Sequence, residues 1–193
     1  VYSKNYDSIL TNPTMPGAKW FEGSRLNFAE NLLSGKPEQI AIIGTGEGRN
    51  DQIFTFEELN TAVASAQKGL RKLGVKSGTR VAAFVPNCVE TVILMLAATA
   101  SGAIWTSCSP DFGSQGVIDR FGQVEPSLLI VANGYHYNGK IFGLEDKING
   151  VLEKIDTIEN VISIEFAQIS CNLNHASIIG YNDLLSDNED TPD

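Results

Sequence analysis

Short apolar runs alternate with helix-length segments through the middle of the chain. Residues 81–85, 103–107 and 128–132 are apolar runs of strand length, and residues 89–101 and 115–124 lie between them. This alternation predicts βαβ units and therefore an α/β fold with a parallel sheet flanked by helices. The segment 89–101 is apolar on nearly every face, so we expect that helix to be buried.

Three loops follow these strands, and ligands bind to parallel sheets beyond the carboxyl ends of their strands. The loops comprise residues 86–90, 107–114 and 133–140. The last one, NGYHYNGK, holds two tyrosines, a histidine and a lysine. His136 and Lys140 are candidates for contact with an anion. A surface or packing role for each of them stays open at this point.

Two residues of the 107–114 loop belong to types that carry chemistry. Ser109 lacks the GxSxG pattern of a nucleophile elbow, and His175 lies in a region without a clear pattern, which disfavours a triad. Asp111 favours a turn over a metal site. The residues alone predict a small-molecule site at the sheet edge and do not define a reaction.

The region before this sheet predicts a hairpin and a long helix. Residues 40–43 and 52–55 have strand character, and the glycine-rich stretch between them lacks GxGxxG spacing and is followed by a strand. A hairpin turn is therefore favoured over a phosphate-binding loop. Thr55 and Glu58 form a capping box for a helix that ends before Gly74.

Other helix starts and a fourth strand follow from similar signals. Asn27 with Glu30 predicts a short helix, and the same spacing recurs in Asn87 with Glu90. Ser114 is the expected cap of the helix over residues 115–124. A further amphipathic helix then leads to a strand over residues 161–164.

The two ends of the chain differ in composition from the rest. Residues 1–19 are polar and rich in turn signals, which predicts an N-terminal arm. Trp20 and Phe21 are interpreted as anchors that pack this arm against the core. Residues 186–193 are acidic and predict a disordered tail.

Charge and cysteine content narrow the function classes. The 193 residues carry a net charge of −9 with a pI near 4.7, which argues against nucleic-acid and anionic-membrane partners. The three cysteines form no CxxC pair, so neither a zinc site nor a disulfide framework is indicated. The most apolar segment, residues 89–100, is shorter than the ~20 residues that span a bilayer. We expect a soluble protein in the reducing cytosol.

Four stretches together carry a resemblance to a known family. They are WFEGSRLNFAENLL, VAAFVPNCVETVILMLAATASGAIWTSCSPDFG, GVIDRFGQVEP and NGYHYNGK. The chain resembles the N-terminal part of acyl-CoA synthetases of the adenylate-forming superfamily, and most of all the members that activate acetoacetate. The resemblance implies that residues 20–185 form an incomplete N-terminal domain of the adenylate-forming fold.

The resemblance implies a two-step ligase reaction that uses ATP, CoA and Mg²⁺. Acetoacetate attacks ATP to give an acyl-adenylate and pyrophosphate, and the CoA thiolate then displaces AMP. Members of the family also carry a Ser/Thr/Gly-rich phosphate loop ending in Pro-Lys and a catalytic lysine, which do not occur in these 193 residues. We therefore expect a fragment that is inactive by itself, and we assign no catalytic or metal-binding residue within it.

The resemblance carries over only the CoA side of the site. By position, Ser109, Pro110 and Asp111 are expected near the CoA nucleotide, and His136 and Lys140 are expected to contact its phosphate. Acetyl-CoA synthetases have glycines and arginines at the positions of Pro110, Asp111, His136 and Lys140. This departure weakens the phosphate contact, because histidine binds phosphate less firmly than arginine and only when protonated.

Three functional hypotheses remain. The first is the N-terminal part of a cytosolic acetoacetate–CoA ligase that serves ketone-body use and lipid synthesis. The second is a truncated, non-catalytic module that binds CoA or another protein. The third, an independent dinucleotide-binding domain, is disfavoured because no GxGxxG turn joins a strand to a helix.

Overall fold

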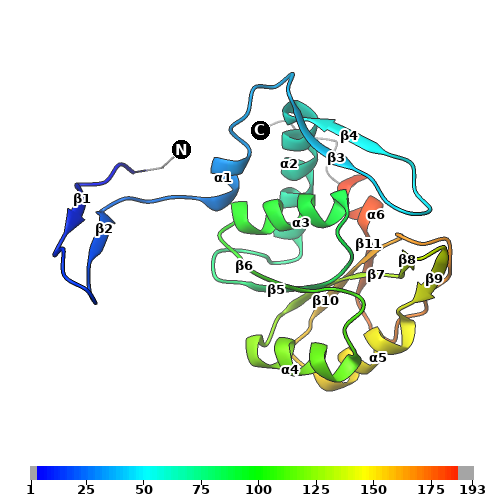
Figure 1. The fold of residues 1–193 in the computed structure, drawn as a ribbon. Helices are drawn as coiled ribbons and strands as arrows, with labels where there is room; N and C mark the ends of the chain where they lie inside the picture. Colours follow the sequence, from blue (N-terminus) through cyan, green and yellow to red (C-terminus); the bar gives the residue numbers. More distant parts are fainter. Residues whose placement is uncertain (1–3, 187–193) are drawn as a thin grey trace.

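The computed structural model describes residues 4–186, and its centre is a parallel sheet of five strands (Figure 1). The strand order is β11-β10-β7-β5-β6. The strands are β5 (Arg80–Phe84), β6 (Ile104–Cys108), β7 (Leu128–Ala132), β10 (Asn160–Ile164) and β11 (Ile178–Gly180). The predicted parallel α/β fold is confirmed. The tail predicted over residues 186–193 lies outside the described residues from position 187 onward.

Helices cover both faces of this sheet, as Figure 1 shows. On one face lie α2 (Phe56–Lys72) and α3 (Val89–Ala100), and on the other lie α4 (Ser114–Val124) and α5 (Glu145–Lys154). The short helix α6 (Tyr181–Ser186) packs against α2. Since both faces are covered, all five residues of β7 are buried, as expected for a central parallel strand.

The helix α2 begins and ends where its sequence signals place it. The Thr55 side chain accepts from the Glu58 N–H, and the Glu58 carboxylate accepts in return from the Thr55 N–H, so the capping box is confirmed. Gly74 follows the helix with a φ of +84°, which glycine adopts without strain. No helix among residues 4–186 combines the length and apolar character needed to cross a membrane.

The capping predictions for the next two helices are wrong. The helix α3 begins after Cys88, which makes no side-chain cap, and Glu90 pairs with Arg49 instead of returning to Asn87. The helix α4 begins after Gly113, so Ser114 is its first residue and not its cap. The Glu90 carboxylate binds Arg49 in an ion pair and is therefore not available to cap the helix. The local sequence pattern does not indicate this ion pair.

Two antiparallel hairpins lie beside the parallel sheet, each as a separate two-stranded sheet. The first, β3 (Ile40–Gly44) with β4 (Gln52–Thr55), confirms the predicted hairpin. The second joins β8 (Gly134–Tyr137) to β9 (Lys140–Gly143). The segment 133–140 was expected to be a loop, and the structure corrects this: residues 134–137 form a strand that turns at Asn138-Gly139.

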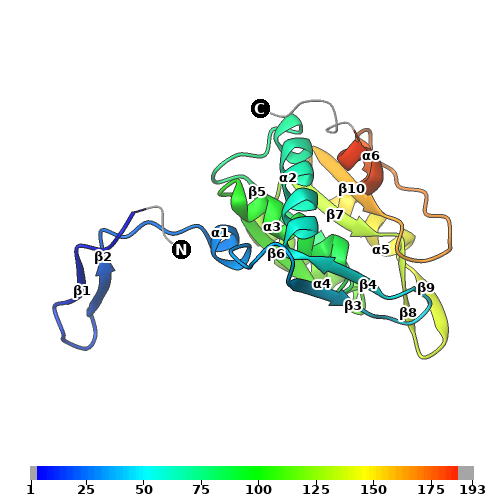
Figure 2. The ribbon, with the colours of Figure 1, turned by 90° about the horizontal axis from the view of Figure 1, so that it is seen from above.

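The N-terminal arm is a separate hairpin. Its strands β1 (Ser8–Thr11) and β2 (Lys19–Glu22) pair antiparallel, and they lie away from the sheet and its helices (Figures 1 and 2). Trp20 and Phe21 are exposed, so their interpretation as anchors to the core is wrong. The helix α1 (Phe28–Leu32) connects the arm to the body, and the Asn27 carboxamide caps it as predicted.

Candidate functional site

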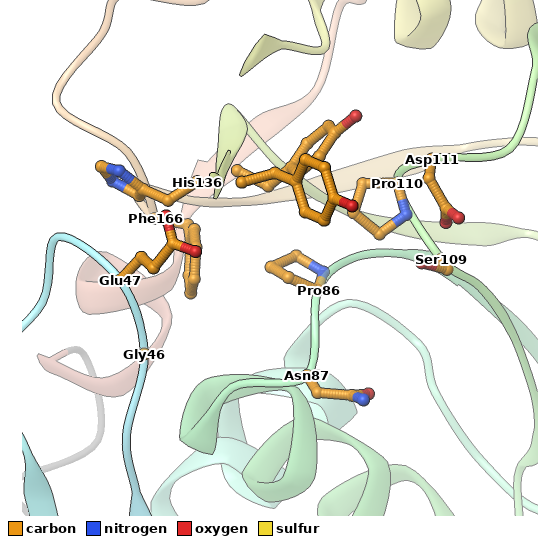
Figure 3. Close-up of a pocket in the computed structure, with 11 residues that line it drawn as sticks. Gly46, Glu47, Pro86, Asn87, Ser109, Pro110, Asp111, His136 and Phe166 are labelled. Atoms are coloured by element: carbon orange, nitrogen blue, oxygen red, sulfur yellow. The ribbon is translucent and has the colours of Figure 1, made fainter. Parts of the chain in front are cut away.

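A cavity of about 650 Å³ lies at the carboxyl ends of the parallel strands (Figure 3). Segments that follow four strands of the sheet contribute to it, and the loop between β3 and β4 closes one side. The lining residues are Gly46, Glu47, Pro86, Asn87, Ser109, Pro110, Asp111, Tyr135, His136, Tyr137 and Phe166. The predicted loops therefore meet at one site, because the carboxyl ends of parallel strands share one edge of the sheet.

Four of the five residues expected on the CoA side line this cavity. Ser109, Pro110 and Asp111 follow β6, and His136 lies on β8. Lys140 is not among the lining residues: it is the first residue of β9 and is exposed beyond the β8–β9 turn. A role in CoA binding stays a prediction for all five.

His136 faces the β3–β4 loop and not the strand ends. Figure 3 shows its imidazole on the opposite side of the cavity from Ser109 and Asp111. The ring packs on Gly48, where an added Cβ would overlap the imidazole. The His136 Nε2 is buried and has no hydrogen-bond partner among the residues that the structure describes. Buried polar atoms in folded proteins nearly always have a hydrogen-bond partner, so this unpaired nitrogen is an unusual feature of the cavity wall.

An ion pair anchors the β3–β4 loop to the body. The Arg49 Nη1 donates to the Glu90 Oε2 at 3.1 Å, and the Nη2 donates to the other carboxylate oxygen. The guanidinium also lies 4.7 Å above the ring centroid of Phe166. The Arg49 and Glu90 side chains are only 22% and 11% exposed, so little water screens the pair. No local signal in the sequence indicates this contact, because 41 positions separate the two residues.

The pKa of Glu90 reflects this pairing. Burial is the largest single effect and by itself would raise the pKa of the carboxyl. The hydrogen bonding and charge of Arg49, a backbone hydrogen bond and the contact with Cys88 together outweigh it, so the pKa is lowered. The same pair raises the pKa of Arg49 through its hydrogen bonds to Glu90. Both groups are therefore charged at neutral pH, and the pair serves to fix the loop.

Glu47 links the two hairpins at the rim of the cavity. Its carboxylate accepts from the Asn138 N–H at 3.2 Å and from the Gly139 N–H at 2.8 Å, with one oxygen for each donor. Both donors belong to the β8–β9 turn, where φ is +50° and +71°. Asn-Gly at these two positions is the sequence signature of such a turn, and it was the available signal for this hairpin.

Asn133 has a structural role at the start of the segment expected to bind ligand. It is buried, and its amide donates to the carbonyls of Ala167 and Ile169 at 2.7 and 2.8 Å. Its Oδ1 accepts from the N–H groups of Phe166 and Ala167. All of its side-chain hydrogen-bonding capacity is used to hold the segment after β10 near the cavity, so it has none left for a ligand.

The cysteines near the site are not activated. Burial raises the pKa of Cys88 to about 11, and burial also raises the pKa of Cys108. Both are therefore thiols at neutral pH and poor nucleophiles. Within residues 4–186, no group of three His, Cys, Asp or Glu side chains is arranged to hold a metal ion.

Comparisons with known proteins agree on one family. The sequence profile of the AMP-binding enzymes matches residues 29–188. The chain is 42% identical to the acetoacetyl-CoA synthetase of Xenopus tropicalis over 170 residues, which cover 86% of this chain and 25% of that protein. It is 46% identical to the acetoacetyl-coenzyme A synthetase of Rhizobium meliloti over 148 residues, which cover 77% and 23%. The chain thus spans about a quarter of the length of the curated relatives it matches.

A solved structure extends the similarity to three dimensions. The acetoacetyl-CoA synthetase from Streptomyces lividans superposes with a TM-score of 0.87 at 36% sequence identity. The match covers 96% of this chain and 29% of that one. The arrangement of sheet and helices described above is therefore similar to that of a solved acyl-CoA synthetase.

Proposed function

Because this chain belongs to the family of AMP-binding enzymes, we propose that it is part of a ligase that joins acetoacetate to CoA with the use of ATP. Acetoacetate is proposed from the names of the relatives, since no described residue is assigned to an acyl pocket. The reaction is proposed for the whole protein and not for these 193 residues by themselves.

The proposed reaction has two balanced steps. In the first, a carboxylate oxygen of acetoacetate attacks the α-phosphorus of ATP, and the bond to the leaving pyrophosphate breaks. In the second, the CoA thiolate attacks the acyl carbon and AMP leaves with its phosphate oxygen. Mg²⁺ would offset the charge of the phosphates, but the described residues offer no metal-binding group, so we assign it to none of them.

We place the contribution of this chain in the second step. The observation that carries this is the meeting of Ser109, Pro110, Asp111 and His136 at one cavity, although they come from two different strand ends. Its volume of about 650 Å³ lies within the range of small-molecule sites. A cavity wall that holds the nucleotide end of CoA would orient the thiol toward the acyl carbon.

Lys140 contributes from outside the cavity in this proposal. It is exposed and follows the β8–β9 turn directly, so its flexible stem can bring the ammonium to a phosphate at the rim. Such a contact is a charge attraction at an exposed position. We therefore expect it to contribute a several-fold and not a thousandfold effect.

The test measures CoA binding to the chain by isothermal titration calorimetry. We expect CoA to bind and Lys140→Ala to weaken that binding about threefold to tenfold. Lys154→Ala is the charge-matched control, because Lys154 is also exposed and lies on α5, away from the lining residues. Equal affinities for the two variants would remove Lys140 from the site.

A chimera tests the complete reaction. This chain replaces the matching segment of the Streptomyces lividans acetoacetyl-CoA synthetase, where 96% of it superposes. Exchange of pyrophosphate into ATP reports the first step, and thioester formation reports the second. Lys140→Ala should raise the KM for CoA and leave the exchange unchanged. A folded chimera that makes no thioester, together with a chain that binds no CoA, would refute the proposed function.

A further inference from the structure

The β8–β9 turn presents two backbone donors to one anion. The N–H groups of Asn138 and Gly139 point at the two oxygens of the Glu47 carboxylate, at 3.2 and 2.8 Å. Successive N–H groups in a turn with positive φ form a concave site that favours anions. The anion that occupies this site is a side chain of the same molecule.

The surroundings of this turn suit a phosphate better than a carboxylate side chain. Lys140 follows the turn immediately, and His136 precedes it by two positions. Within residues 4–186, the Glu47 carboxylate makes no hydrogen bond or ion pair to Lys140 or His136. A phosphate presents several oxygens at once, so it can engage the two N–H donors and a neighbouring cation together.

The loop that carries Glu47 also covers His136. Gly48, the next residue, packs on the imidazole, and the His136 Nε2 beneath it is buried without a partner among the described residues. Leaving a buried polar atom unpaired is unfavourable, so a second arrangement in which this nitrogen gains a partner would recover that cost. Withdrawal of Glu47 and Gly48 from the turn would provide such an arrangement.

We propose that Glu47 is a specificity-determining residue that occupies, in the absence of ligand, the anion site of the β8–β9 turn. An incoming phosphate group competes with the Glu47 carboxylate for the Asn138 and Gly139 N–H groups. The carboxylate thereby lowers the affinity for weakly bound anions and admits a ligand that also binds elsewhere in the cavity. This inference rests on the proposed function for its ligand, the phosphate of CoA, but not for the site itself.

The test compares two variants that each remove one negative charge from the same loop. Glu47→Gln keeps the shape of the side chain and loses the charged acceptor. Asp51→Asn is the matched control, because Asp51 is exposed and, within residues 4–186, makes no hydrogen bond to the β8–β9 turn. Titration with CoA should show binding that is about five- to tenfold tighter for Glu47→Gln and unchanged for Asp51→Asn.

Amide chemical shifts locate the effect. The ¹H–¹⁵N signals of Asn138 and Gly139 should move when Glu47 is replaced, and added inorganic phosphate should then move them further. In Asp51→Asn, the same phosphate concentrations should move the Asn138 and Gly139 signals no further than they do in the wild type. A Glu47 with only a structural role would give lower stability in Glu47→Gln and no gain in anion affinity.

The outcomes separate this inference from the proposed function. CoA binding that is the same in wild type and Glu47→Gln, with no phosphate response at the turn, overturns the inference and leaves the function standing. A phosphate response at Asn138 and Gly139 without CoA binding in either protein supports the anion site and refutes the CoA assignment. CoA binding that is tighter in Glu47→Gln than in wild type, and unchanged in Asp51→Asn, supports both the anion site and the CoA assignment.

Discussion

Arg49 and Glu90 provide a quantitative test of how the cavity wall is held. The perturbations are Glu90→Gln, Arg49→Met and the two combined. Each single replacement removes one partner of a two-fold hydrogen-bonded ion pair and leaves the other in a largely buried place. The combined replacement removes both charges and leaves none unpaired.

The magnitude follows from the burial of the pair. Breaking a fully buried pair costs ~3–5 kcal/mol, whereas an exposed pair contributes ~0–1 kcal/mol. Since Arg49 and Glu90 are 22% and 11% exposed, we expect about 2–3 kcal/mol for Glu90→Gln. Arg49→Met also loses the contact with the Phe166 ring, which adds ~0.5–1 kcal/mol. The double variant should lose less than the sum by about 1.5–2 kcal/mol.

Urea unfolding followed by tryptophan fluorescence measures these free energies. Trp105 packs against the core and reports the folding of the sheet, whereas Trp20 is exposed in the arm. Glu153→Gln is the control, because its pair with Lys154 is 74% and 60% exposed, and it should cost less than about 0.5 kcal/mol. Additive single effects, or equal costs for Glu90→Gln and Glu153→Gln, would contradict this account of the pair.

Acid provides a second measure of the same pair. The pKa of Glu90 is lowered in the folded chain, so its charge stabilises the fold above its ordinary pKa of 4.5. That contribution is lost as the pH falls through the lower folded value. The stability difference between wild type and Glu90→Gln should therefore be full at pH 7 and should shrink below about pH 4.

Three further predictions concern single positions. Gly48→Ala should lower the free energy of unfolding in urea by about 1–2 kcal/mol or more, because φ is +71° and the new Cβ would meet His136. Gly46→Ala is the control: its Cβ would point into open space, so it should change that free energy by less than about 0.5 kcal/mol. Asn133→Ala should cost about 2–4 kcal/mol, since it leaves several backbone groups unpaired near the cavity; stability as high as wild type would contradict that role. Cys88 should alkylate roughly a hundredfold more slowly than an exposed thiol at pH 8 by mass spectrometry, and rapid labelling would contradict its raised pKa of about 11.

Local patterns were sufficient to predict four of the five strands of the parallel sheet (β5, β6, β7 and β10) and the four helices α2 to α5 that cover it. The continuous apolar run of β7 and the capping box of Thr55 with Glu58 depend on residues that are neighbours in the chain. The edge where ligands bind follows from the same patterns, because it is fixed by the direction of the strands. Four of the five residues that the family resemblance placed on the CoA side line the cavity at this edge.

Some local signals were present but interpreted wrongly. Asn138-Gly139 between alternating residues indicates a two-residue hairpin turn, although the segment was expected to be a loop. The aromatic pair Trp20 and Phe21 suggested a buried anchor, yet both belong to a hairpin that makes its ring contacts within the arm, including Phe21 with Tyr6. Aromatic residues alone do not say which surface they face.

The α/β fold, the alternating strands and helices of its parallel sheet and the edge that carries the site follow from the amino-acid sequence, because hydrophobic periodicity acts over a few residues. The contacts of Arg49 with Glu90 and of Glu47 with the β8–β9 turn emerge only in three dimensions. These partners are 41 and 91 positions apart, and each looks like an ordinary charged surface residue in the sequence. Their contacts arise because the β3–β4 hairpin folds over the edge of the sheet, and no local pattern encodes that approach.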